Sequence, residues 1–119
     1  MKQLITLAIR IMPLLFGACL VFTVMMALIP GDALMQFNLW DKAQHALAFA
    51  VLTLTGSLAY ANKTKAVYIG LILYGVIIEV MQNVLTSTRF SGVSDVLADG
   101  VGMAIGFVIY LAVRKVFRV

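Results

Sequence analysis

Charge, and the residues that crosslink or interrupt a chain, are scarce in this sequence. Of 119 residues, 12% are charged, two are proline, and cysteine and histidine occur once each. A single cysteine, Cys19, excludes an intrachain disulfide. No set of cysteines and histidines has the spacing of a zinc site, and neither a glycine-rich phosphate loop nor a hydrolase nucleophile motif is present. The sequence therefore has none of the familiar motifs of soluble metal-binding proteins, nucleotide-binding proteins or hydrolases.

Apolar residues make up most of the chain instead. The hydrophobic share is 63% and the mean hydropathy is +1.05, whereas soluble domains are roughly 45–50% apolar. A soluble fold of this size has too little interior to bury so much apolar surface. Four helices of about 20 residues each would fit within one domain of this length. We therefore predict an all-α polytopic membrane protein, a single domain over residues 1–119 with four transmembrane helices in an antiparallel bundle.

Four apolar runs mark the predicted spans, at about residues 4–29, 43–61, 66–85 and 95–113. The first run ends at Pro30 and Gly31, a pair of helix breakers. It continues past Cys19, which favours a retained span over a cleaved signal peptide. The loop at 31–40 is apolar, so we expect it to lie along the outer membrane interface with Trp40 at the headgroup level.

Basic residues are distributed unevenly between the two sides of these spans. One side carries Lys2, Arg10, Lys63, Lys65, Arg114, Lys115 and Arg118. The other side carries only Lys42 and Arg89. Because short loops rich in Lys and Arg stay in the cytoplasm, both termini are predicted to be cytoplasmic. These basic residues lie at the ends of apolar runs and form no basic face, so the lipid bilayer is the expected partner and nucleic acid is not.

Polar residues inside the third predicted span point to a site near the outer side. Glu79 lies 13 residues after the cytoplasmic start of that span, or about 20 Å across a hydrocarbon core of about 30 Å. Gln82 follows on the same helical face, and Arg89 comes next in the outer loop. Ionisable groups at this depth are costly, so they usually face a bundle interior or water.

The second and fourth spans begin on the same side with further ionisable residues. His45 lies one helical turn after Asp41, which would hold the imidazole in one tautomer or raise its pKa. Asp95 and Asp99 are also one turn apart, and their carboxylates repel each other unless a proton, a cation or Arg89 intervenes. These residues are expected at similar depth, but the sequence does not define the rotation of the helices about their axes.

Each of these residues also has a structural interpretation. Glu79 paired with Arg89 or His45 would join two helices without any further role. Asp95 would favour a helix N-terminus through the helix dipole, with Ser94 as the cap. Lys42 and Arg89 would anchor the helices at the membrane interface.

Small residues in the fourth span allow another helix to approach closely. Gly102 and Gly106 form a small-xxx-small pattern. Packing within the chain is the favoured interpretation of this pattern, and a homo-oligomer through the same two glycines is the alternative.

An ordered set of residues resembles the VanZ-like family of small bacterial membrane proteins. The set covers roughly residues 40–106, and its members are Asp41, Lys42, Ala43, Gln44, His45, Phe49, Leu52, Glu79, Val80, Met81, Gln82, Arg89, Ser94, Asp95, Asp99, Gly102 and Gly106. Two positions depart from the family pattern, which usually has Asn in place of Asp99 and often Tyr near Phe49. The resemblance implies a protein of the bacterial cell envelope and cytoplasmic membrane, linked by the family name to glycopeptide (teicoplanin) resistance, and it does not imply a reaction.

Three functions remain open at this stage. The first is a site at the outer leaflet that binds or modifies a lipid headgroup or a lipid-linked envelope precursor through its phosphate. Its catalytic candidates are His45, Glu79 and Asp95, and its substrate-binding candidates are Asp41, Lys42, Gln82, Arg89 and Asp99. No organic cofactor is expected, although carboxylates with an imidazole are also ligands for a divalent cation that bridges to phosphate. The second function is a non-enzymatic scaffold or accessory subunit whose polar residues lock the bundle, and the third, less favoured, is a transporter.

Overall fold

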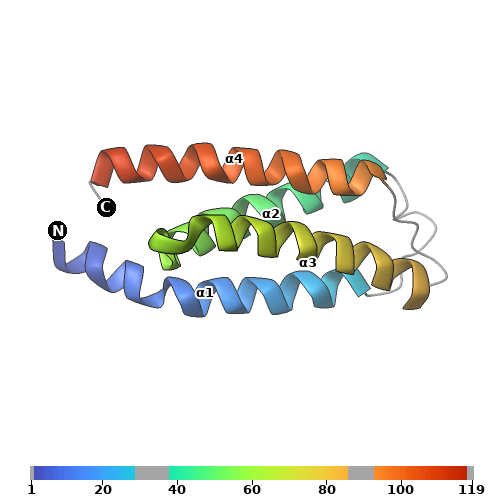
Figure 1. Cartoon of the computed structure of the whole chain (residues 1–119), viewed down its shortest axis with the longest axis horizontal. Helices are drawn as coiled ribbons and strands as arrows, with labels where there is room; N and C mark the ends of the chain where they lie inside the picture. Colours follow the sequence, from blue (N-terminus) through green and yellow to red (C-terminus); the bar gives the residue numbers. More distant parts are fainter. Residues whose placement is uncertain (1, 29–37, 86–92, 118–119) are drawn as a thin grey trace.

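The computed structural model describes residues 2–28, 38–85 and 93–117, and these residues are helical almost throughout. Four α-helices follow one another as α1 (Lys2–Leu28), α2 (Asn38–Ala59), α3 (Thr64–Leu85) and α4 (Val93–Phe117), with a short 3₁₀ helix, η2 (Ala61–Lys63), between α2 and α3. They run side by side along the long axis of a molecule of 48 × 24 × 22 Å (Figure 1). Consecutive helices point in opposite directions, so that both ends of the chain lie at the same end of the molecule (Figure 1).

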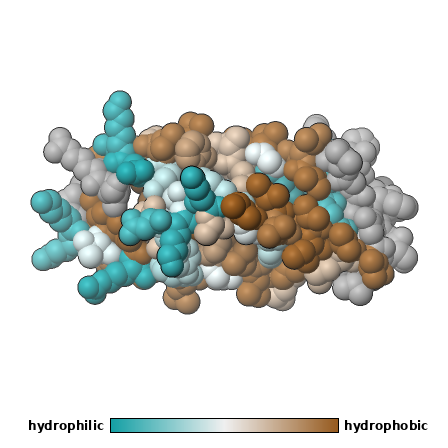
Figure 2. Space-filling view, viewed as in Figure 1, coloured by the Kyte–Doolittle hydropathy of each residue, from teal (hydrophilic) through white to brown (hydrophobic). Residues whose placement is uncertain are grey.

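Three of the four helices are long and apolar enough to cross a membrane. The qualifying stretches are Lys2–Ala27, Ala61–Gln82 and Asp95–Phe117. Large apolar side chains such as Leu14, Val84 and Val116 are mostly exposed on them. Figure 2 shows apolar residues over much of the bundle, whereas hydrophilic residues gather at the end where both termini lie. A surface of this kind is stable when lipid covers it.

Helix α2 is the polar centre of the bundle. It packs most extensively against α4 and next against α1. Its buried residues include Phe49 and Leu52, but also three hydroxyl residues, Thr53, Thr55 and Ser57. Together with Lys42, Gln44 and His45, these hydroxyl residues make α2 less apolar than its neighbours, which explains why it is not among the three helices that qualify as spans by composition.

The α2–α4 seam is a contact of backbone on backbone, made by Gly102 and Gly106. A Cβ atom added to Gly102 would lie 2.1 Å from the carbonyl oxygen of Ala46, and one added to Gly106 would lie 2.5 Å from that of Ala50. Only glycine allows two helices to approach so closely. Both glycines thus pack within the chain, as favoured above, and an oligomer through them stays a prediction.

Helix boundaries differ from the expected ones mainly at the ends that carry the candidate site. Helix α2 begins at Asn38, so residues 38–40 are helical and the predicted interface loop is wrong for them, while 29–37 lie outside the described residues. Residues 38–41 include neither proline nor glycine to stop a helix from extending. Helix α4 begins at Val93, which places Ser94 inside the first turn instead of at the expected capping position before Asp95.

Candidate functional site

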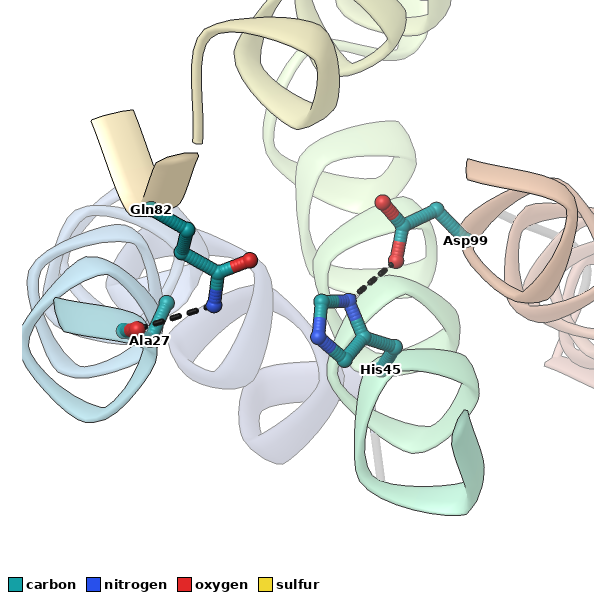
Figure 3. A network of polar contacts seen from close by, with 4 residues as sticks. All are labelled: Ala27, His45, Gln82 and Asp99. Carbon is teal, nitrogen blue, oxygen red and sulfur yellow. Dashed lines mark hydrogen bonds and ion pairs between the residues drawn. The ribbon is translucent and has the colours of Figure 1, made fainter. Parts of the chain in front are cut away.

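A hydrogen-bonded pair joins α2 to α4 beside the glycine seam. His45 Nδ1 lies 2.9 Å from Asp99 Oδ1, and the side chains are 10% and 7% exposed (Figure 3). When Asp99 is ionised, its carboxylate accepts the hydrogen bond, and His45 Nδ1 carries the proton and donates it. Asp99 precedes Gly102 by three residues, so the close approach at that glycine also brings the two side chains together.

Glu79 and Asp95 complete a cluster around His45. One ligand atom from each of His45, Glu79 and Asp95 lies within 4.8 Å of the other two. The two acidic residues are only 6% and 5% exposed, so their carboxyl groups are buried among three helices. With Asp99, the cluster holds three carboxyl groups and one imidazole. Side chains far apart in the sequence therefore meet in one small volume, which we call the acidic cluster (His45, Glu79, Asp95 and Asp99).

Gln82 borders the acidic cluster and connects α3 to α1. Its Nε2 donates a hydrogen bond of 2.8 Å to the carbonyl oxygen of Ala27 near the end of α1 (Figure 3). The ring nitrogen of His45 that does not face Asp99 is on the side of the view where Gln82 lies (Figure 3). Gln82 thus has a defined contact between α3 and α1, and its substrate-binding role stays a prediction.

The remaining predicted site residues are less well defined. Lys42 is partly buried one turn before His45, and no hydrogen bond or ion pair joins it to another described residue. Asp41 belongs to α2, but its side chain lies outside the description, as does the whole of Arg89. The described partner of His45 Nδ1 is Asp99, from another helix. A contact between Asp41 and His45 stays a prediction, because the Asp41 side chain lies outside the description.

Comparison with known proteins gives a clear result at the level of the family. The family model described as VanZ/LLP1 matches residues 5–115, nearly the whole chain. The chain belongs to the VanZ-like family. No curated protein and no solved structure matches it significantly. Membership confirms the resemblance seen in the ordered polar residues and extends it to α1, which had no diagnostic residues of its own.

Gly75 is a residue of this VanZ-like site that the sequence reasoning missed. A Cβ added there would lie 3.1 Å from Asp99 Oδ2 and 3.2 Å from the ring of Phe49. The absence of a side chain lets α3 approach the His45–Asp99 pair closely. The available signal was a glycine one helical turn before Glu79, on the same face of the same helix.

Hydroxyl groups further along the VanZ-like bundle were also missed. Ser57 Oγ and Tyr68 OH lie 3.1 Å apart between α2 and α3, and Tyr74 OH donates to the carbonyl oxygen of Leu20 in α1. The Thr53 hydroxyl is fully buried and has no hydrogen-bond partner among the described residues. The signal in the sequence was the series of hydroxyl residues at 53–57, which are polar but not ionisable.

Proposed function

We propose that this protein crosses the bacterial cytoplasmic membrane four times, with both termini in the cytoplasm. Three helices qualify as spans by composition, and α2 is 22 residues long, or about 33 Å, which also matches a hydrocarbon core of about 30 Å. Its polar residues are mostly buried against α4, α1 and α3, so lipid does not have to solvate them. The excess of basic residues at the end with both termini supports this orientation.

We further propose that the acidic cluster is the working site and that it binds the headgroup of a lipid or lipid-linked envelope precursor in the outer leaflet. One observation carries this proposal: four ionisable side chains from three helices converge inside an apolar bundle. Burying so many charged or protonated groups costs free energy, and membrane proteins retain such groups mainly where they serve a function. A structural link between two helices would need only one pair.

The headgroup ligand that we propose carries a phosphate. Three of the four members of the cluster are acidic, so a phosphate needs a cation between itself and these carboxylates. Arg89, ten residues after Glu79 in the sequence, is our candidate for a direct contact with the phosphate, because a guanidinium binds phosphate with two parallel hydrogen bonds. Asp41 and Lys42, at the start of α2, are the other candidates near the membrane surface.

At the level of the cell, the proposal places the protein in envelope metabolism. Binding of a lipid-linked precursor would connect the site to the glycopeptide resistance that gives the family its name. A catalytic step by His45, Glu79 or Asp95 is an extension of the proposal, since binding alone explains the convergence of these side chains.

A structural scaffold or accessory subunit is the second candidate function. It is favoured by two hydrogen bonds that only hold helices together, from Gln82 to the carbonyl of Ala27 and from Tyr74 to that of Leu20. On this alternative, the acidic cluster locks the bundle in the same way. The two functions differ in whether removal of a cluster side chain affects binding independently of folding.

Headgroup binding is tested with the purified full chain by native mass spectrometry. The probe is a polyprenyl phosphate, and the neutral polyprenol of the same length is its control. We expect the phosphate to bind and the alcohol to bind at least about tenfold more weakly, since a charge-assisted contact contributes about 1.5–3 kcal/mol. Asp95→Ala should remove this preference, whereas Tyr74→Phe, which alters only a contact with α1, should keep it.

Equal binding of the two lipids by the wild-type protein would refute the headgroup proposal. Loss of the preference in both variants, in proportion to their loss of folded protein, would favour the scaffold.

The proposed orientation is tested by cysteine labelling in cells. In a Cys19→Ser background, Ser91→Cys should react with an impermeant thiol reagent added outside, and a reporter fused after Val119 should report a cytoplasmic location. Labelling of the cysteine at position 91 only after the membrane is permeabilised would reverse the topology.

A further inference from the structure

We propose that the acidic cluster is a binding site for a divalent transition-metal ion. The ligands are His45 Nε2 and one carboxylate oxygen each from Glu79 and Asp95, and Asp99 is a positioning residue that orients the imidazole. The metal site adds a bound ion to the proposed headgroup site. Only the contact between this ion and a phosphate rests on the proposed headgroup function. Metal binding itself requires no lipid.

The three ligand atoms are close to the separations that a metal ion requires. Four-coordinate zinc with bonds of about 2.0–2.2 Å places its ligand atoms about 3.3–3.5 Å apart. One ring nitrogen of His45 and one carboxylate oxygen each from Glu79 and Asp95 lie within 4.8 Å of one another, so ligand atoms at this separation need to move inward by about an ångström or less. Rotation of the long Glu79 side chain covers such a distance without a shift of the helix.

Asp99 gives His45 the geometry of a metal ligand. Its carboxylate accepts the Nδ1 proton at 2.9 Å, which fixes the tautomer and leaves the Nε2 lone pair directed away from Asp99. A ligating histidine almost always donates its other ring N–H to a carboxylate or a carbonyl in this manner. A Cβ added to Gly75 would lie 3.1 Å from Asp99 Oδ2, so α3 passes close to this carboxylate and limits the space around it.

Burial of the two acidic ligands, Glu79 and Asp95, favours the binding of a dication. Glu79 and Asp95 lie in a low-dielectric interior within 4.8 Å of each other, where two negative charges repel strongly. A dication between them compensates both charges at once.

The ligand set indicates which ion fits and what it does. One imidazole nitrogen with two carboxylate oxygens suits Zn²⁺ or Mn²⁺ better than Mg²⁺ or Ca²⁺, which prefer oxygen alone. Three protein ligands leave at least one coordination position open. In the proposed function, a phosphate oxygen of the headgroup takes this position, so the metal ion links the phosphate to the carboxylates of the acidic cluster.

The single histidine of the chain allows a direct test on the wild-type protein. With ¹⁵N-histidine, metal-free protein in lipid nanodiscs should show one pair of imidazole nitrogen signals. One equivalent of Zn²⁺ should shift the Nε2 signal and leave Nδ1 protonated, and Mn²⁺ should broaden both signals through its unpaired electrons. An Nε2 signal that is unchanged by both ions would overturn the proposal without any variant having to fold.

Variants then test the ligand assignment by their metal affinity. Glu79→Gln should weaken Zn²⁺ binding by more than about 100-fold, beyond the 10–100-fold typical of a residue that only orients a ligand. Asp99→Asn should fall within that range, because an amide oxygen still accepts the Nδ1 proton. The matched control is Cys19→Ser, which removes the only thiol of the chain and should leave the affinity unchanged. Loss of binding in Cys19→Ser, with retention in Glu79→Gln, would assign the metal elsewhere.

The same protein separates this proposal from the headgroup function. Polyprenyl phosphate binding is measured before and after a chelator removes the metal. Zinc binding at His45 without any preference for the phosphate lipid would retain the metal site and reject the headgroup function. A phosphate preference that persists in metal-free protein would retain the function and overturn the bridging role of the metal.

Discussion

The two sides of the bundle are held together in different ways. Helices α2 and α4 meet backbone to backbone at Gly102 and Gly106. Helices α1 and α3 meet through long side chains, Gln82 and Tyr74, whose polar ends reach carbonyl groups of α1. An apolar groove of about 390 Å³ lies between these two helices. The α2–α4 interface is fixed by backbone contacts and leaves no room for adjustment. The α1–α3 interface depends on side chains, which change rotamer more easily than a backbone moves.

This difference divides the acidic cluster into a fixed part and an adjustable part. His45 and Asp99 stand on the tight α2–α4 seam and are already hydrogen bonded. Glu79 comes from α3, on the more loosely held side, and its carboxylate has to approach the other ligands to bind a metal ion. A rigid pair with one adjustable ligand allows an ion to enter and still defines its final geometry.

The largest effect is expected from a single methyl group on the seam. Gly102→Ala places a Cβ against the carbonyl of Ala46, which belongs to the backbone and has no free space to move, so we expect a loss of about 3 kcal/mol or more. Gly100→Ala is the matched control, because a Cβ there meets nothing within 4 Å. Thermal unfolding in detergent measures both. Similar stability of the two variants would contradict the backbone contact.

The next largest loss of stability is expected from a substitution of Asp99 that removes its acceptor oxygen. Asp99→Leu leaves the buried His45 N–H without its partner and should cost about 1–3 kcal/mol. Asp99→Asn keeps an acceptor oxygen and should be tolerated, in line with the asparagine usual in the family. The same unfolding measurement compares the two. Equal losses of stability in Asp99→Leu and Asp99→Asn would mean that the hydrogen bond to His45 does not hold the imidazole in place.

The smallest effect is expected on the adjustable side. Tyr74→Phe removes the hydrogen bond to Leu20 but keeps the ring, so the loss should be about 0.5–1.5 kcal/mol. Unfolding midpoints of this variant and Gly102→Ala test the comparison directly. A larger loss in Tyr74→Phe would make the α1–α3 interface the one that holds the bundle together.

Much of the fold was predictable because hydropathy and helix length are local properties of the sequence. The four apolar runs and their breakers gave helices at nearly the right places. Helix α2 extends before the predicted span, to Asn38, because residues 38–41 are polar or charged in part but contain no helix breaker. Counting residues along each helix also placed Glu79, Asp95 and His45 at a similar level, and one ligand atom from each lies within 4.8 Å of the other two.

The pairing within the site was not predictable from the same pattern. Which carboxylate faces His45 depends on how α2 and α4 rotate about their axes, and Gly102 and Gly75 determine this rotation through contacts far apart in sequence. The hydrogen bond between His45 and Asp99 therefore could not be read from the spacing of residues along α2. The buried Thr53 was missed because a hydroxyl group in an apolar run changes the hydropathy little.

Glu79→Gln provides the most direct test of the central claim that the acidic cluster is a working site. The amide keeps the size of the side chain and removes a charge from a crowded acidic interior, so the metal-free variant should unfold at the same temperature as wild type or higher. Its phosphate-lipid binding per folded molecule should be lost. A variant that is clearly less stable, yet binds the lipid as well as wild type does per folded molecule, would contradict the account and favour the scaffold.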